Sequence, residues 1–106
     1  MQKFQKSLLV IIAESGLERN LIHDVQRLGA AGYTVTDVRG GGHSGVREGA
    51  WEADRTIRLE VVCDEAVADA IGEHVLTSYA SDFGVTIYFS AVDVLRPNKF
   101  SPATSI

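Results

Sequence analysis

The chain has 106 residues, a length that supports one hydrophobic core and therefore one domain. Its formal net charge of −4 argues against a nucleic-acid-binding protein, because such proteins depend on an excess of Lys and Arg. The single cysteine, Cys63, excludes an internal disulfide and fits a reducing, cytoplasmic location. Because Cys63 lies in a strand-like run, we expect a buried apolar side chain rather than a nucleophile.

A strand followed by a helix opens the chain. Residues 7–13 are a continuous apolar run of the length of a buried strand. Ser15 and Glu18 then match the spacing of a capping box, which predicts the start of a helix. We expect that helix to stop near Gly29 or Gly32, because glycine commonly follows a helix end. Its apolar side chains recur at helical spacing: Leu17, Leu21, Val25 and Leu28.

A second strand leads into a glycine-rich loop. Residues 32–39 are rich in β-branched and aromatic side chains, which predicts a strand. Gly40, Gly41 and Gly42 follow, and a largely polar loop continues to residue 53. Glycine leaves its amide accessible, so this backbone can hold an anion, with Arg47 nearby to supply charge. The alternative is that these glycines only form a flexible turn, although loops of this length are usually functional.

The second half of the chain repeats the order of strand, helix and strand. Residues 56–63 alternate between apolar and polar side chains, as in a half-buried strand. Asp64 is a favourable N-cap for the next helix, and residues 85–95 alternate again as a last strand. Residues 97–106 show no periodicity, so we expect an extended or disordered tail. The apolar stripe of the second helix consists of Val67, Ala70, Ile71, Val75 and Tyr79.

The order β-α-β-loop-β-α-β predicts an α+β, ferredoxin-like fold with residues 1–96 as the domain. In this fold a four-stranded antiparallel sheet carries both helices on one face and leaves the other face bare. The last strand places Tyr88 on one side and Ile87 and Phe89 on the other, so both sides carry large apolar groups. A sheet left uncovered on an apolar face usually packs against a partner, which predicts a homo-oligomer.

The segment Gly-Tyr-Thr-Val-Thr-Asp-Val-Arg-Gly-Gly-Gly at residues 32–42 resembles the second-strand signature of PII and PII-like signal-transduction proteins. The resemblance extends over residues 7–96, including Arg-Leu-Glu-Val-Val at 58–62. It is strongest to the branch associated with inorganic-carbon transport and carboxysomes, whose loop also carries a Val-Arg pair, here Val46 and Arg47. The resemblance implies a homotrimer that binds adenine nucleotides in clefts between subunits. It also implies that residues 40–53 form the T-loop, whose order changes with the bound ligand.

The resemblance assigns roles to several positions. The two threonines of the second strand would line the nucleotide cleft. The backbone of the glycine triplet and the turn at 82–85 would face the phosphates, and the main chain of Val62 would read the adenine edge. Arg96 and Lys99, near the end of the last strand, loosely match the family's paired arginines. The nucleotide-binding residues implied are Thr34, Thr36, Gly40, Gly41, Gly42, Val62, Phe83, Gly84 and Arg96.

Departures from the family pattern narrow the expected ligands. The loop has Trp51 and no tyrosine, so covalent nucleotidylation is not expected. His43 stands where nitrogen-sensing members place a glutamine that helps to hold magnesium and 2-oxoglutarate, so no metal is expected. Thr86 replaces a lysine that grips the outer phosphates. Because a charge-assisted contact contributes about 1.5–3 kcal/mol, its loss favours ADP, AMP or cyclic AMP over ATP.

A second anion, bicarbonate, is a further candidate ligand, with His43, Arg47 and Lys99 as the residues that would contact it or a phosphate. For both Arg47 and His43 the alternative is a solvated polar residue of the loop; for Arg47 the resemblance favours the anion contact. Trp51 would contact a partner protein in carbon uptake or fixation, since tryptophan is enriched at interface hot spots; the alternative is packing on its own domain. His23 has no partner at ligand spacing, which argues against zinc.

Two other functions remain as alternatives. Tyr33 and Tyr88 offer a base-stacking platform for an RNA-binding module, although the acidic balance argues against it. A small ferredoxin-fold enzyme would need a polar cavity between sheet and helices, which the apolar strand faces do not suggest. No catalytic triad or dyad follows from the spacing, so we expect no enzyme. The glycine run formally matches Gly-x-Gly-x-x-Gly, but no helix opens behind it, which excludes a dinucleotide fold.

Overall fold

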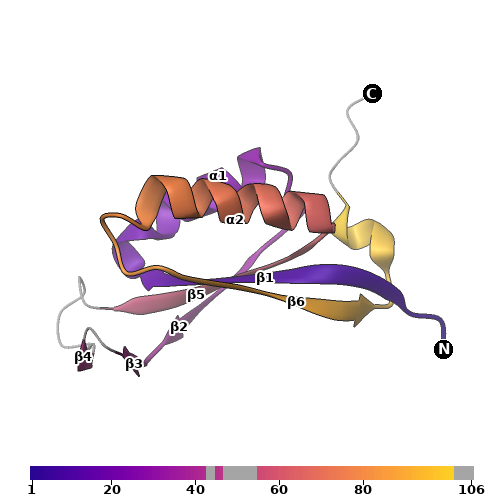
Figure 1. Cartoon of the computed structure of the whole chain (residues 1–106). Helices are drawn as coiled ribbons and strands as arrows, with labels where there is room; N and C mark the ends of the chain where they lie inside the picture. The colour runs from indigo at the N-terminus through magenta and orange to yellow at the C-terminus, as the bar shows by residue number, and fades with distance from the viewer. Residues whose placement is uncertain (43–44, 47–54, 102–106) are drawn as a thin grey trace.

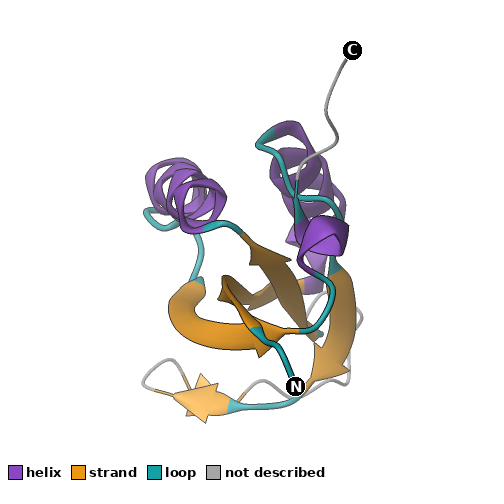
Figure 2. Ribbon diagram, turned by 90° about the vertical axis from the view of Figure 1, so that its right-hand side faces the viewer, coloured by secondary structure: helices purple, strands orange, loops and turns teal. Residues whose placement is uncertain are grey.

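The computed structural model describes residues 1–42, 45–46 and 55–101. A four-stranded sheet forms its centre, with the strand order β2-β5-β1-β6, and every neighbouring pair is antiparallel. Both helices lie on one face of this sheet (Figures 1 and 2), so the ferredoxin-like fold class is confirmed. The elements are β1 (Phe4–Glu14), α1 (Glu18–Arg27), β2 (Thr34–Val38), β5 (Thr56–Cys63), α2 (Glu65–Tyr79) and β6 (Thr86–Val94).

The core lies between the sheet and the helices, because alternate side chains of each strand point to the helical face. Leu9 and Ile11 of β1 pair with residues of β5 that are equally buried, and Cys63 closes this row as predicted. Each large apolar side chain buried in this way contributes about 1.5–3 kcal/mol to folding. The buried core residues are Leu9, Ile11, Ala13, Leu17, Leu21, Val25, Leu59, Val61, Cys63, Ala68, Ile71 and Val75.

The start of α1 differs from the sequence prediction. The capping box is wrong: Ser15–Leu17 forms a 3₁₀ turn, and α1 begins at Glu18 with Leu17 as an N-cap that makes no side-chain hydrogen bond. The Ser15 main-chain N–H instead donates to the Arg55 carbonyl oxygen at 2.7 Å. This hydrogen bond joins the β1–α1 corner to the residue before β5, a contact between distant segments that a local motif does not encode.

The end of α1 follows the first of the two predicted stops. Gly29 adopts a φ of 113°, in the left-handed region that only glycine enters without strain. Its N–H donates to the Gln26 carbonyl, and the Ala30 N–H donates to the Val25 carbonyl at 2.9 Å. These two bonds form a Schellman motif, which satisfies carbonyls that the helix end leaves without a partner.

Helix α2 begins after Asp64, the predicted N-cap residue, which has extended backbone angles but makes no capping hydrogen bond. Its carboxylate Oδ1 lies 2.5 Å from Lys6 Nζ instead. Farther along, α2 approaches β6 closely at Gly72, where a Cβ would come within 2.7 Å of the Phe89 ring. The absence of a side chain at Gly72 therefore allows the helix to rest on the edge strand.

Three further short elements, two strands and a 3₁₀ turn, were not predicted. Within the loop after β2, β3 (Gly41–Gly42) pairs antiparallel with β4 (Gly45–Val46), although glycine has low strand propensity. The tail prediction is wrong for its first residues, because Pro97–Phe100 forms a 3₁₀ turn rather than extended chain. Proline favours the first position of such a turn, since its φ is already fixed. Residues 102–106 of the predicted tail lie outside the described residues.

Candidate functional site

The antiparallel registers bring several loops to one end of the sheet. Glu14 of β1 pairs with Thr56 of β5, which also pairs with Val38 of β2, and Thr86 of β6 pairs with Ile12. The loop that leaves β2 and the turn that enters β6 therefore project from the same end, as Figure 1 shows. We call this end, defined by Glu14, Val38, Thr56 and Thr86, the loop end of the sheet.

The glycine triplet and the turn before β6 both lie at the loop end, next to the two edge strands of the sheet. Gly40 follows β2 closely, and a Cβ built on it would meet no heavy atom within 4 Å, so the surroundings of this backbone are open. Gly41 and Gly42 are paired in the small ribbon with β4, which occupies part of their hydrogen-bonding capacity. Phe83 is 37 % exposed beside Gly84. The structure thus brings these two predicted phosphate-facing segments to one side of the molecule.

The predicted threonines lie on the open face of the sheet. Thr34 and Thr36 are exposed on β2, an edge strand, and pair with Glu60 and Arg58 of β5. Arg58 Nε lies 2.8 Å from Glu60 Oε1, so a charge pair sits beside the threonines. Val62, the predicted adenine contact, is half-buried and two positions beyond Glu60 on the same face.

Arg96 and Lys99 lie at the opposite end of the sheet. β6 runs from Thr86 at the loop end to Val94, which pairs with Phe4 near the start of β1. Arg96 and Lys99 follow that end and are both exposed, and the Lys99 N–H donates to the Arg96 carbonyl at 3.2 Å. Within one chain, therefore, these two cations and the glycine triplet lie at opposite ends of the sheet. His43, Arg47 and Trp51 lie outside the described residues.

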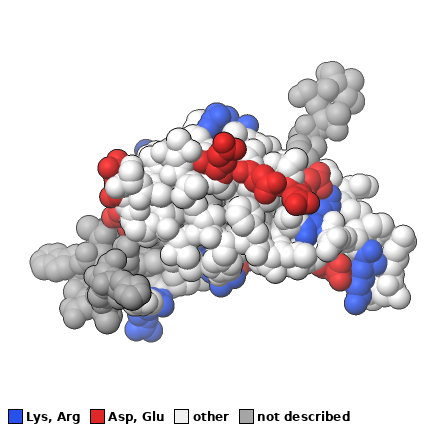
Figure 3. All heavy atoms as spheres, viewed as in Figure 1, with Lys and Arg blue, Asp and Glu red and all other residues white. Residues whose placement is uncertain are grey.

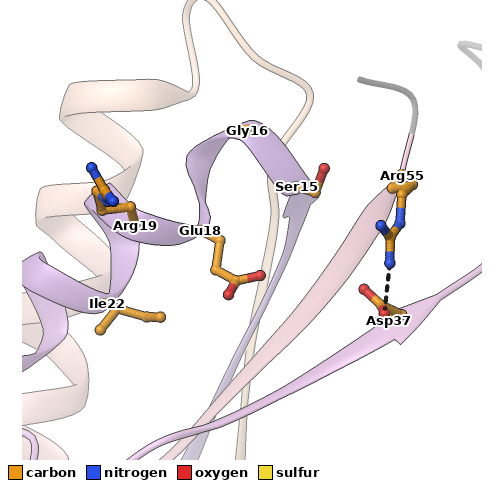
Figure 4. A pocket seen from close by; sticks show the side chains of 7 residues that line it. All are labelled: Ser15, Gly16, Glu18, Arg19, Ile22, Asp37 and Arg55. Carbon is orange, nitrogen blue, oxygen red and sulfur yellow. Dashed lines mark hydrogen bonds and ion pairs between the residues drawn. The ribbon is translucent and has the colours of Figure 1, made fainter. Parts of the chain in front are cut away.

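A pocket that the sequence did not predict opens beside the loop stem (Figure 4). It has a volume of about 600 Å³ and lies between the β1–α1 corner and the ends of the loop. Arg55 Nη2 lies 3.0 Å from Asp37 Oδ2, an ion pair that joins the two strands where the loop leaves and returns. Glu18 and Ile22 of α1 point toward this pair, whereas Arg19 turns away (Figure 4). In the sequence, this pocket could have been indicated only by the opposite charges of Asp37 and Arg55, which stand on either side of the loop.

The charged side chains and possible metal ligands of the described residues are distributed as follows. Among the described residues on the face in Figure 3, Lys and Arg side chains are scattered among acidic ones, without a continuous basic patch. Within residues 1–42, 45–46 and 55–101, no three His, Cys, Asp or Glu side chains gather closely enough to hold a metal ion. Neither α1 nor α2, the helices of the described part, combines the length and apolar character that a membrane crossing needs.

Solved structures share this fold over nearly the whole chain. A PII-like signalling protein of Thermus thermophilus is 39 % identical, with a TM-score of 0.82, and the match covers 94 % of this chain and 99 % of that chain. CPII of Thiomonas intermedia, a nitrogen regulatory PII-like protein bound to ADP, AMP and bicarbonate, is 23 % identical with a TM-score of 0.84. That match covers 93 % of this chain and 96 % of CPII.

The family model described as nitrogen regulatory protein P-II matches residues 6–99. This span contains nearly the whole four-stranded sheet, both helices and the candidate residues from Thr34 to Lys99. A trimer is consistent with this match, as is a regulatory rather than an enzymatic role. The sequence, the fold and the matched span agree, and the chain belongs to the P-II family.

Proposed function

We propose that this chain is a PII-like regulator that binds an adenine nucleotide between the subunits of a homotrimer. The observation that carries this proposal is the separation of Gly40 from Arg96 by the length of β6. A strand of that length spans about 30 Å, more than a mononucleotide reaches. A phosphate that contacts both groups therefore requires two chains. CPII, which shares the fold, is bound to ADP, AMP and bicarbonate.

ADP, AMP or cyclic AMP is the proposed effector, in preference to ATP. Thr86 is exposed at the loop end, just after the turn that holds Phe83 and Gly84. A threonine there supplies no positive charge to the outer phosphates. Because a charge-assisted hydrogen bond contributes about 1.5–3 kcal/mol, the triphosphate loses most by the replacement.

Bicarbonate is the proposed second effector, with His43, Arg47 and Lys99 as contacts. Ligand binding would order the T-loop at 40–53, since a ligand shifts such an equilibrium by its differential affinity for the two states. Trp51 would then contact a partner protein in inorganic-carbon uptake or fixation. We place the regulator in the cytoplasm, where a single unpaired cysteine such as Cys63 is compatible with the reducing conditions.

Isothermal titration calorimetry tests the nucleotide proposal. ADP, AMP, cyclic AMP and ATP are each titrated with and without bicarbonate, and we expect ATP to bind at least about tenfold more weakly than ADP. Arg96→Ala should weaken ADP binding. Arg19→Ala, which removes the same charge from α1, serves as the matched control. Absence of heat with all four nucleotides would exclude the proposal.

The preference against ATP has its own gain-of-function test. Thr86→Lys restores a cation at the start of β6 and should raise ATP affinity by about tenfold or more, with less effect on AMP. Thr77→Lys, on the exposed surface of α2, adds the same charge elsewhere and should leave both affinities unchanged. An equal gain for AMP and ATP would show that the lysine does not act at the outer phosphates.

A further inference from the structure

Polar side chains join the two helices on the side opposite to the open sheet face. The Tyr79 hydroxyl of α2 donates to Asp24 Oδ2 of α1, with 2.5 Å between the oxygens. His74 Nε2 lies 3.2 Å from the same carboxylate oxygen, and Arg27 Nη2 lies 3.9 Å from Oδ1. Asp24 is only 8 % exposed, so its carboxylate depends on these partners, because an unpaired buried charge is costly.

Tyr79 is held firmly in this cluster as a hydrogen-bond donor. Burial and the hydrogen bond to Asp24 raise the pKa of Tyr79 to about 12, so the hydroxyl keeps its proton at physiological pH. The rings of His74 and Tyr79 also meet edge to face, with 6.2 Å between their centroids. The side chain at the end of α2 is therefore fixed to α1 by its hydroxyl and to its own helix by its ring.

The backbone of the same residue fixes the turn that follows α2. The Tyr79 carbonyl oxygen accepts hydrogen bonds from the N–H groups of Asp82, at 3.1 Å, and Phe83, at 2.9 Å. The Val85 N–H then donates to the Phe83 carbonyl at 2.9 Å, which closes the turn just before β6. Gly84 lies inside this segment. Tyr79 thus connects α1, through its side chain, to the predicted phosphate-facing turn, through its carbonyl.

We propose that Asp24 and Tyr79 are positioning residues, which hold the turn at 82–84 in the conformation that binds phosphate. This inference rests on the proposed nucleotide binding, and neither side chain is itself a predicted nucleotide contact. We call the hydrogen bond from the Tyr79 hydroxyl to Asp24 the tie between the helices. Without this tie the last turn of α2 opens more often, since helix ends open at low cost in free energy. Nucleotide affinity then falls in proportion to the fraction of molecules whose turn remains formed.

Tyr79→Phe removes the donor and keeps the ring, so it tests the tie directly. We expect its affinity for ADP, measured by calorimetry, to fall by about fivefold or more. Asp24→Asn keeps an acceptor oxygen and should lose less affinity than Asp24→Ala. Val25→Ala is the matched control, because it removes buried volume next to Asp24 while leaving the Tyr79 hydroxyl and its acceptor in place. If Val25→Ala weakens ADP as much as Tyr79→Phe, general destabilisation explains the loss and the inference is wrong.

Hydrogen exchange in the nucleotide-free protein separates this inference from the proposed function. The Asp82 and Phe83 amides should exchange faster in Tyr79→Phe and Asp24→Ala than in the unmodified chain, relative to core amides of β1. If the unmodified chain does not bind ADP, the proposed function fails while the exchange data still decide whether the tie holds the turn. Unchanged exchange in Tyr79→Phe would overturn the inference.

Discussion

Cys63 shows how burial alters the chemistry of one side chain. It is 0 % exposed at the end of β5, and burial, followed by the nearby charge of Asp64, raises the pKa of its thiol from 9.0 to about 11. The folded chain therefore keeps this proton over a pH range in which the unfolded chain loses it. The contribution of the thiol to stability is complete below pH 9 and decreases above it, because the unfolded state then binds fewer protons.

Urea unfolding at pH 8 and at pH 10 measures this effect. The free energy of unfolding should fall by about 1 kcal/mol more in the unmodified chain than in Cys63→Val. The difference between the two chains isolates the thiol, since Tyr79 titrates in both. An identical decrease in the variant would mean that the thiol ionises equally well in the folded chain.

Some features of single residues were predictable from the sequence, and others were not. Leu59 lies between Arg58 and Glu60, and Cys63 falls on the same face four residues later, so their burial followed from the period of a strand. The hydrogen bond between Tyr79 and Asp24 did not follow, because the two residues are 55 positions apart and lie on different helices. The sequence placed Tyr79 in an apolar stripe, and nothing near it in the sequence marks Asp24 as the acceptor of its hydroxyl. Such pairs are fixed by how the helices lie on the sheet, which no local pattern records.

At the scale of the element, the end of α1 depends on one backbone conformation. Gly29→Ala places a Cβ at a φ of 113° and should lower the free energy of unfolding by about 1–2 kcal/mol. Gly32→Ala is the matched control: its Cβ would meet no atom within 4 Å, and we expect little change. Thermal unfolding followed by circular dichroism compares the two. Equal melting temperatures would contradict the role given to Gly29.

Element boundaries were predicted well where periodicity alone decides them. β5 was correct in both bounds, and β6 differed by one residue at each end. β1 begins at Phe4, earlier than predicted, because its first residues pair with the far end of β6. The β3–β4 ribbon was not predicted, since glycine signals a turn in any local reading. The longer β1 and the ribbon both come from strand pairing, which a local pattern does not record.

At the scale of the whole molecule, the open sheet face carries Tyr88, which is 40 % exposed opposite the fully buried Val10. In the proposed homotrimer we expect this face to be the contact between chains. Tyr88→Arg should therefore dissociate the assembly, because a charge cannot be buried there without a partner. Leu76→Arg, at a site that is 62 % exposed on α2, should leave it intact.

Sedimentation velocity gives the measurement. The unmodified chain and Leu76→Arg should sediment as three chains of 11.5 kDa each, and Tyr88→Arg as one. A trimeric Tyr88→Arg would show that chains meet through another surface. The sequence predicted an oligomer from the two-sided apolar character of β6, but the separation of candidate residues between two ends of the sheet required the strand registers.

That separation links ligand affinity to protein concentration. With Gly40 and Arg96 at opposite ends of one sheet, a solitary chain offers an incomplete set of the proposed nucleotide contacts. Dilution below the point at which chains stay together would then abolish binding, and saturating nucleotide would hold the assembly together by mass action. A cell with few copies of this protein would thus need more effector to produce the same response.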